Sequence, residues 1–122
     1  MHHFPATIKL LVVAVIATLA ATACSVGSAV EAPSDDAELV RGQDLYTNNC
    51  ASCHGSDGGG GRGPELRSAA LLERYPTPPD LRQLIAVGRR TMPGFEGRFT
   101  DEQLDDVVRY TREVLGTAGF RE

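Results

Sequence analysis

The chain has 122 residues, 42% of them hydrophobic and only 6% aromatic, which is enough for one small domain with short appendages. Its formal net charge is −4; without the N-terminal segment that holds Lys9, eleven arginines face sixteen acidic residues, a net charge of −5. An acidic chain without basic repeats argues against nucleic acid as a partner. The net charge alone favours a partner that presents basic residues.

The first 23 residues have the pattern of a signal peptide. Residues 10–23 (LLVVAVIATLAATA) are an uninterrupted run of apolar and small residues after a short, weakly positive start. Such a run is short for a membrane-spanning helix but fits the apolar region of a signal peptide, and Ala21-Thr22-Ala23 fits an A-x-A cleavage site. We therefore expect residues 1–23 to direct export and to be removed. An uncleaved anchor is the alternative.

Cys24 follows the expected cleavage site directly. A small-residue run cut before a cysteine resembles the signal of bacterial lipoproteins, which implies a lipid on Cys24 and attachment to a membrane. Ala21 departs from that resemblance, because such signals usually have leucine there. A free or cross-linking thiol is the alternative. Residues 24–37 are small, polar and acidic, and we expect them to form a flexible tether with a reach of roughly 20 Å.

A first helix is predicted over residues 37–49. Leu39, Leu45 and Tyr46 contribute to an apolar stripe at helical spacing, and Gly42 lies on the same face as Tyr46. A glycine inside a helix costs about 1 kcal/mol relative to alanine. We therefore expect Gly42 to permit the close approach of another element.

Residues 50–54, Cys-Ala-Ser-Cys-His, carry the strongest chemical signal in the chain. C-x-x-C-H is the attachment signature of a c-type haem: Cys50 and Cys53 can form thioethers with the two vinyl groups of one porphyrin, and His54 then lies under the iron as proximal ligand. A thioredoxin-like dithiol would need a preceding strand, and a structural zinc site would need a second ligand pair that the sequence lacks. A disulfide would close a loop too short to stabilise much. We expect one covalent haem c and a poorly folded apoprotein.

Residues 55–64 contain six glycines and end in a proline. This density permits close backbone approach. No strand precedes the segment and no G-K-[ST] follows it, so a phosphate-binding loop is disfavoured and we expect the segment to wrap the haem edge. A short helix is predicted over residues 66–75. After three prolines, a third helix is predicted over residues 80–87, with Pro79 at its first position and Gly88 at its end.

The last helix is predicted to start at a capping box formed by Thr100 and Gln103. Apolar residues then recur at helical spacing up to Leu115, and Gly116 is a suitable C-terminal stop. The predicted fold class is all-α.

Met92 is the candidate for a second axial iron ligand. After removal of the signal peptide, the chain has no other methionine, no histidine besides His54 and no lysine. Met92 lies in a Pro- and Gly-bearing loop over residues 89–95, where backbone geometry can aim its sulfur. A thioether favours ferrous iron and raises the reduction potential relative to two imidazoles. A methionine that fills a core gap and an iron left open are the alternatives; Arg89 and Arg90 either pair with haem propionates or are solvated.

These residues together resemble the class I c-type cytochromes. Gly42, Tyr46 and Tyr110 fit the glycine and aromatic positions where the first and last helices cross in that family. Residues 63–66 resemble the element whose proline carbonyl, here that of Pro64, accepts a hydrogen bond from the proximal histidine. The methionine of the family is followed by proline, as Met92 is. The resemblance implies three to four helices around one covalently bound haem, in a domain over residues 38–118 followed by a tail over 119–122.

The function that we expect from this reading is electron transfer and not catalysis. A monohaem carrier would pass single electrons between redox partner proteins (a membrane respiratory complex, an oxidase or a dehydrogenase) outside the cytoplasmic membrane, in the periplasm or at the cell surface. A cytochrome subunit dedicated to one dehydrogenase complex is the first alternative. A haem enzyme or gas sensor with an open iron is the second.

Overall fold

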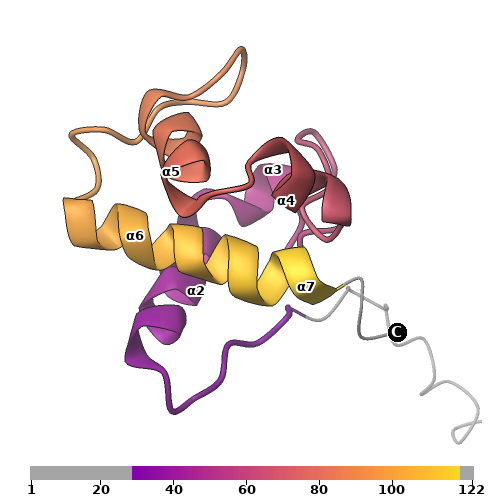
Figure 1. Ribbon diagram of the computed structural model, residues 1–122, viewed down its shortest axis with the longest axis vertical. Helices are drawn as coiled ribbons and strands as arrows, with labels where there is room; N and C mark the ends of the chain where they lie inside the picture. The colour runs from indigo at the N-terminus through magenta and orange to yellow at the C-terminus, as the bar shows by residue number, and fades with distance from the viewer. Residues whose placement is uncertain (1–28, 119–122) are drawn as a thin grey trace, which may run out of the picture.

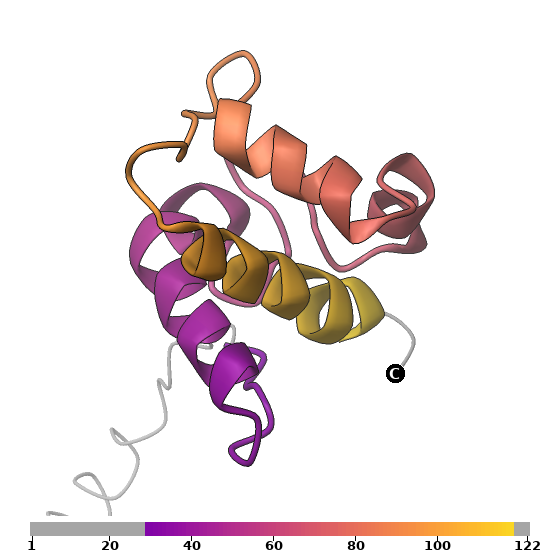
Figure 2. The ribbon, with the colours of Figure 1, turned by 60° about the vertical axis from the view of Figure 1, so that its left-hand side comes forward.

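The computed structural model describes residues 29–118, and this part of the chain contains helices and connecting segments but no β-strand. In chain order the helices are α2 (Ala37–Asn49), α3 (Ala51–His54), α4 (Ala69–Arg74), α5 (Pro78–Val87), α6 (Asp101–Arg109), η1 (Tyr110–Leu115) and α7 (Gly116–Ala118). Figures 1 and 2 show α2 crossing the α6–α7 run on one side, with α3, α4 and α5 on the other. The predicted all-α fold with crossing terminal helices is confirmed.

The crossing of α2 and α6 depends on Gly42. A Cβ atom built on Gly42 would lie 2.2 Å from the carbonyl oxygen of Asp106 and 2.8 Å from the Cβ of Tyr110. No side chain fits at this position, so the two backbones can come this close only because residue 42 is a glycine. Tyr46 and Tyr110 fill the adjoining space with ring centroids 5.5 Å apart, and both are almost fully buried. The expected role of Gly42 in a close helix approach is therefore confirmed.

The core is built by apolar side chains from α2, α4, α5, α6 and η1, together with one aromatic ring from the loop before α6. Its buried members are Leu39, Tyr46, Leu71, Leu81, Ile85, Ala86, Phe95, Leu104, Val107, Val108, Tyr110, Val114 and Leu115. Burial of this set removes apolar area from water and holds the helices together.

Side-chain caps set the starts of α2 and α6. The carboxylate of Asp36 accepts hydrogen bonds from the backbone N–H groups of Glu38 and Leu39 at the start of α2, both at 3.1 Å. Thr100 accepts from the N–H of Gln103 at 3.2 Å, and the Gln103 side chain accepts from the N–H of Thr100 at 2.9 Å, so the predicted capping box is present.

The two middle helices differ in length from the prediction. Helix α4 is shorter than residues 66–75, since it covers only Ala69–Arg74, and α5 begins at Pro78, two residues before the predicted start at Asp80. Asp80 lies in the first turn of α5, where its carboxylate accepts from the N–H of Thr77 at 3.0 Å. Both Pro78 and Pro79 fit that first turn, because its N–H groups have no helical acceptor.

The last helix differs from the prediction in its second half. The run widens into a π-helix over Tyr110–Leu115 and continues to Ala118, so Gly116 lies inside the run and does not stop it. The Thr111 hydroxyl donates to the carbonyl of Val107 at 2.7 Å and thus competes for a backbone acceptor of the preceding turn. Apolar periodicity does not distinguish such a widened turn from an α-helix.

The segment before α2 is attached to the domain. The Tyr110 hydroxyl donates to the carbonyl of Val30 at 2.5 Å, and the Ala32 N–H donates to the Gln43 side chain at 2.8 Å. Arg109 contacts Asp36 at 2.9 Å, and this hydrogen-bonded guanidinium is the main cause that lowers the pKa of Asp36. Of the tether expected over residues 24–37, the described part from residue 29 on therefore lies against α2 and η1.

The expected signal peptide, Cys24 and the tail over residues 119–122 lie outside the described residues. Among residues 29–118, no helix has both the length and the apolar character that crossing a bilayer requires.

Candidate functional site

The site begins where α2 ends. Cys50 lies between α2 and α3, and its carbonyl accepts from the N–H groups of Cys53 and His54, both at 3.0 Å. This single turn places two free, half-buried thiols three residues apart, with a buried histidine directly after the second. Burial is the main cause that raises the pKa of the Cys50 thiol, to about 11.

A tyrosine from α2 fixes the end of this turn. The Tyr46 hydroxyl donates to the carbonyl of Gly55 at 2.7 Å, directly after His54. Burial is the main cause that raises the pKa of Tyr46, so its hydroxyl remains a protonated donor. From the sequence, Tyr46 is expected only to pack between helices. Its place one helical turn before Cys50 is the signal that could have indicated this second role.

The imidazole of His54 is oriented by the loop that follows it. Its Nδ1 lies 2.9 Å from the carbonyl oxygen of Pro64. Because a carbonyl can only accept, Nδ1 carries the proton and Nε2 keeps the lone pair that a metal binds. The N–H of Gly63 donates to the carbonyl of Cys53 at 2.8 Å, which holds the loop against the turn that bears the histidine.

Gly63 lies directly against the His54 ring. A Cβ atom on Gly63 would lie 2.7 Å from Cε1 and 2.8 Å from Nδ1 of His54, too close for any side chain. The Gly60 N–H donates to the carbonyl of His54 at 2.8 Å and folds the loop back over the turn. The glycine-dense segment is therefore shaped around the imidazole. In the sequence, Gly63 is one of six glycines in residues 55–64, and only its place directly before Pro64 distinguishes it.

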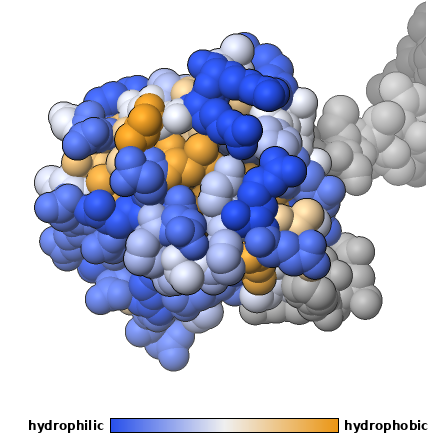
Figure 3. Space-filling view, turned by 45° about the horizontal axis from the view of Figure 1, so that its top comes forward, coloured by the Kyte–Doolittle hydropathy of each residue, from blue (hydrophilic) through white to orange (hydrophobic). Residues whose placement is uncertain are grey.

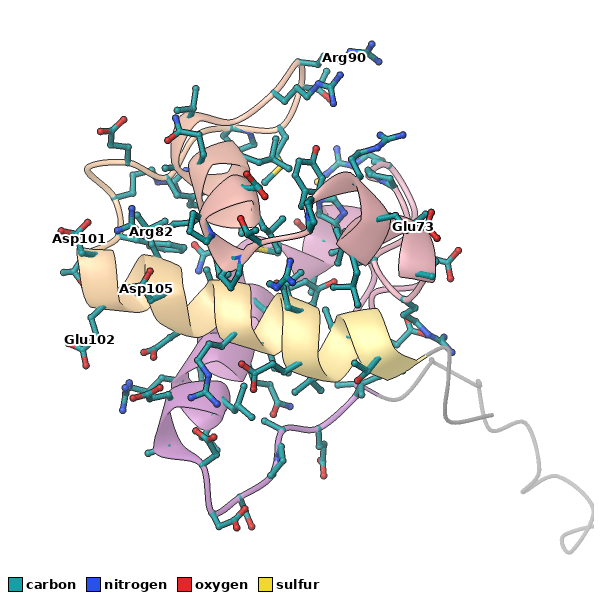
Figure 4. All side chains as sticks on the ribbon, in the orientation of Figure 1. Glu73, Arg82, Arg90, Asp101, Glu102 and Asp105 are labelled. Carbon is teal, nitrogen blue, oxygen red and sulfur yellow. The ribbon has the colours of Figure 1, made fainter. Side chains whose placement is uncertain are left out.

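Met92 lies in the loop between α5 and α6. Its side chain is partly buried and packs against the core. Its N–H and carbonyl pair with the carbonyl and N–H of Arg89, at 3.0 and 3.1 Å. Arg90 adopts a left-handed φ of 56° in this turn, and Figure 4 shows it at the tip of the loop, pointing away from the helices. Among the described residues, neither Arg89 nor Arg90 forms an ion pair.

The face above the α6–α7 run is apolar at its centre. Figure 3 shows hydrophobic side chains gathered on the face that lies uppermost in Figure 1, with hydrophilic side chains around them. The elements on that side are α3, α4, α5 and the loop after α5. Leu66, Tyr75, Leu84 and Met92 are among the side chains that are only partly buried against the core. Two thiols on one turn, an imidazole with Nε2 available and an apolar face together fit a covalently attached haem.

Comparison with known proteins agrees with this site. Residues 37–110 match the family described as cytochrome c oxidase, cbb3-type, subunit III. Cytochrome c6 of Nostoc sp. (strain PCC 7120) is 33% identical over 92 residues, which cover 74% of this chain and 80% of that protein. The cytochrome c subunit of the cytochrome bc1 complex of Corynebacterium diphtheriae is 31% identical over 84 residues, which cover 68% of this chain and 30% of that subunit.

A solved structure agrees as well. Cytochrome cL from the marine methylotrophic bacterium Methylophaga aminisulfidivorans superposes with a TM-score of 0.55 at 25% identity, over 67% of this chain and 58% of that one. The chain belongs to the class I c-type cytochromes: it is an electron carrier with one covalently bound haem c. The predicted fold, family and cofactor are thus confirmed.

Proposed function

We propose that His54 and Met92 are the two axial ligands of a haem attached through Cys50 and Cys53, and that the protein passes single electrons between redox partners. The observation that carries this proposal is the hydrogen bond from His54 Nδ1 to the Pro64 carbonyl at 2.9 Å. It fixes the ring and its tautomer, and a donor bond of this kind makes Nε2 a better ligand. Met92 is supported by its position in a loop whose backbone is closed at Arg89.

In this proposal, some residues attach the haem and others set its reduction potential. The haem supplies a one-electron ferrous/ferric couple when bound. Cys50 and Cys53 hold it in place, and Pro64 keeps the imidazole of His54 oriented. The Met92 thioether favours the ferrous state and raises the potential. If His54 and Met92 both bound the iron, no position on it would remain for a substrate, which would suit transfer of electrons between proteins.

The substitution Met92→Ala tests this ligation. We expect a lower reduction potential and binding of carbon monoxide by the reduced variant, because the sixth position then opens. Redox titration and optical spectra of the reduced and oxidised protein measure both effects. Thr91→Ala, at the exposed neighbouring position, is the matched control and should change neither. An unchanged potential in Met92→Ala, or carbon monoxide binding by the reduced native protein, would count against the proposal and favour an open-iron haem protein.

We propose that the partners are respiratory membrane complexes, which this protein would contact on the outer side of the cytoplasmic membrane. The matched family is described as an oxidase subunit, and one relative is a cytochrome bc1 complex subunit. An electron carrier between a membrane complex and an oxidase fits both. Because these relatives are subunits, a cytochrome bound permanently to one complex is the second candidate. Co-purification of a stoichiometric complex from native membranes would favour the second, and isolation as a single chain would favour the first.

We further propose export by residues 1–23 and lipidation of Cys24, which is the first residue after the A-x-A site. The substitution Cys24→Ala should move the protein from the membrane fraction to the soluble fraction, because the acyl chains would be lost. Immunoblots of fractionated cells measure the distribution, with Ser25→Ala as the control. Unchanged fractionation of Cys24→Ala would rule out the lipid anchor.

A further inference from the structure

The loop that carries Met92 is closed at its base by two glycines. Residues 88–94, here called the Met92 loop, leave the end of α5 at Gly88 and return across it at Gly94. A Cβ atom on Gly88 would lie 2.6 Å from the nitrogen of Gly94. A Cβ atom on Gly94 would lie 2.6 Å from the carbonyl oxygen of Val87 and 2.7 Å from that of Ala86. The neighbours are backbone atoms, which cannot rotate away, so the crossing excludes any side chain at either position.

Hydrogen bonds hold the returning end of the loop on α5. The N–H of Phe95 donates to the carbonyls of Ile85 and Ala86 at 3.1 and 2.9 Å, and the N–H of Glu96 donates to the carbonyl of Ala86 at 2.9 Å. Both carbonyls belong to the last turn of α5, where carbonyls lack helical donors. Phe95 is 3% exposed and stacks on Phe99 with ring centroids 4.8 Å apart. The base is therefore held by the core and by the helix end together.

The backbone of Met92 is fixed within the same loop. Its N–H and its carbonyl both pair with Arg89, and the turn between them is completed by the left-handed Arg90. Neither polar backbone group of Met92 is free to adapt to a haem. The backbone of Met92 therefore has a fixed place within the loop.

We propose that Gly88 and Gly94 are positioning residues for the iron–sulfur bond: their contact at the base of the Met92 loop sets the reach of the thioether and hence the reduction potential. This inference rests on the proposed ligation by Met92. A loop raised from α5 by one added methyl group would displace the sulfur from the position that binds the iron. A weakened thioether bond then favours ferric iron and allows competing ligands to bind.

The substitution Gly94→Ala in the haem-loaded protein tests the proposal. Gly94 does not have a left-handed φ, so the added methyl group introduces the close contact and no backbone strain. We expect loss of the thioether-to-iron charge-transfer absorption of the ferric protein and binding of carbon monoxide by the ferrous protein. We also expect at least a tenfold shift of the ferrous/ferric equilibrium towards ferric iron, about 59 mV for one electron.

Gly97→Ala is the matched control. Gly97 lies in the same connection to α6 with a left-handed φ of 78°, but a Cβ atom there meets nothing within 4 Å. This variant carries backbone strain without the contact and should keep the absorption and potential of the native protein. If Gly94→Ala keeps them too, or if Gly97→Ala loses them equally, the positioning role is wrong.

A failure of the ligation itself is distinguishable from a failure of the inference. If the native ferric protein lacks the charge-transfer absorption and Met92→Ala leaves the potential unchanged, the proposed ligation fails and the inference fails with it. If the native protein has this absorption and Gly94→Ala retains it, only the inference fails.

A measurement on the native protein covers the case in which Gly94→Ala gives no haem-loaded product. Saturating imidazole should displace the sulfur while amide exchange of Phe95 and Glu96 stays slow, because the base of the loop is closed without the iron–sulfur bond. Exchange of these amides that accelerates to the rate of an open chain would show that the iron holds the loop, and would overturn the proposal.

Discussion

At the scale of single residues, the site depends on backbone groups placed against the ring of His54. The ring donates a hydrogen bond from Nδ1 to the backbone carbonyl of Pro64, and Gly63 lies against the ring where a side chain would collide with it. A family resemblance can indicate the proline. The space that the glycine leaves open becomes evident only when the loop is seen folded over the imidazole.

This geometry predicts that two neighbouring substitutions differ in their effect on the reduction potential. Gly63→Ala should displace the His54 ring, destabilise the haem-loaded protein by about 1 to 3 kcal/mol through overpacking, and lower its reduction potential. Pro64→Ala keeps the carbonyl acceptor, so we expect a potential close to that of the native protein. Denaturant unfolding and redox titration measure both. Equal shifts of potential in the two variants would show that the proline ring, and not the carbonyl, orients the histidine.

At the scale of elements, the crossing of α2 and α6 shows how one position can override helix propensity. Alanine is the better helix former by about 1 kcal/mol, yet Gly42 faces the carbonyl oxygen of Asp106 at a distance that no Cβ tolerates. The helices can cross this closely only because residue 42 is a glycine, although glycine has the lower helix propensity. Arg41, the preceding residue, completes the contact through a 2.8 Å ion pair with Asp106.

The substitution Gly42→Ala should therefore destabilise the protein although it raises helix propensity. We expect a net loss of about 1 to 3 kcal/mol, since an added methyl group must force two backbones apart. Thermal or denaturant unfolding of the haem-loaded protein measures the loss. Thr47→Ala, at an exposed position of the same helix, should stay within about 0.5 kcal/mol of the native protein. A stabilised Gly42→Ala would mean that the crossing is looser than the structure shows.

At the scale of the whole molecule, charge is distributed unevenly. Residues 51–99, which form the side of the molecule that carries the apolar face, contain seven arginines and five acidic residues. Residues 29–50 and 100–118 contain three arginines and ten acidic residues. Figure 4 shows Arg90 at the tip of the Met92 loop, while Asp101, Glu102 and Asp105 lie together at the start of α6. The net charge of the chain therefore does not describe the face that carries the site.

This distribution predicts how charged reagents react with the haem-loaded protein. Oxidation by the anionic hexacyanoferrate(III) should slow severalfold at low ionic strength in the double variant Arg89→Glu, Arg90→Glu, because local charge steers the approach. The difference should vanish as the Debye length falls from about 30 Å at 0.01 M to about 3 Å at 1 M salt. Stopped-flow absorbance measures the rates. The control is the double variant Asp101→Lys, Glu102→Lys, which makes the net charge more positive by the same amount, but at the start of α6. An equally large effect there would mean that net charge alone governs the approach.

The sequence by itself determined the features that need only neighbours along the chain. The spacing of Cys50, Cys53 and His54 lies within one helical turn, and the capping box of Thr100 and Gln103 spans three residues. Short-range chemistry of this kind is encoded locally, so the family, the cofactor and the first helix could be predicted. Because the predicted mature chain has no other methionine and no histidine besides His54, composition alone made Met92 the candidate for the second ligand.

Only the tertiary structure decided which segments meet and how closely. Three contacts join residues that are not neighbours in sequence. The Tyr46 hydroxyl bonds to the carbonyl of Gly55, Gly63 lies against the His54 ring, and Gly94 crosses the end of α5. Whether a methyl group fits between two backbones depends on distances of tenths of an ångström after the chain has folded. No periodicity or spacing contains that information, because it arises from packing of the whole core.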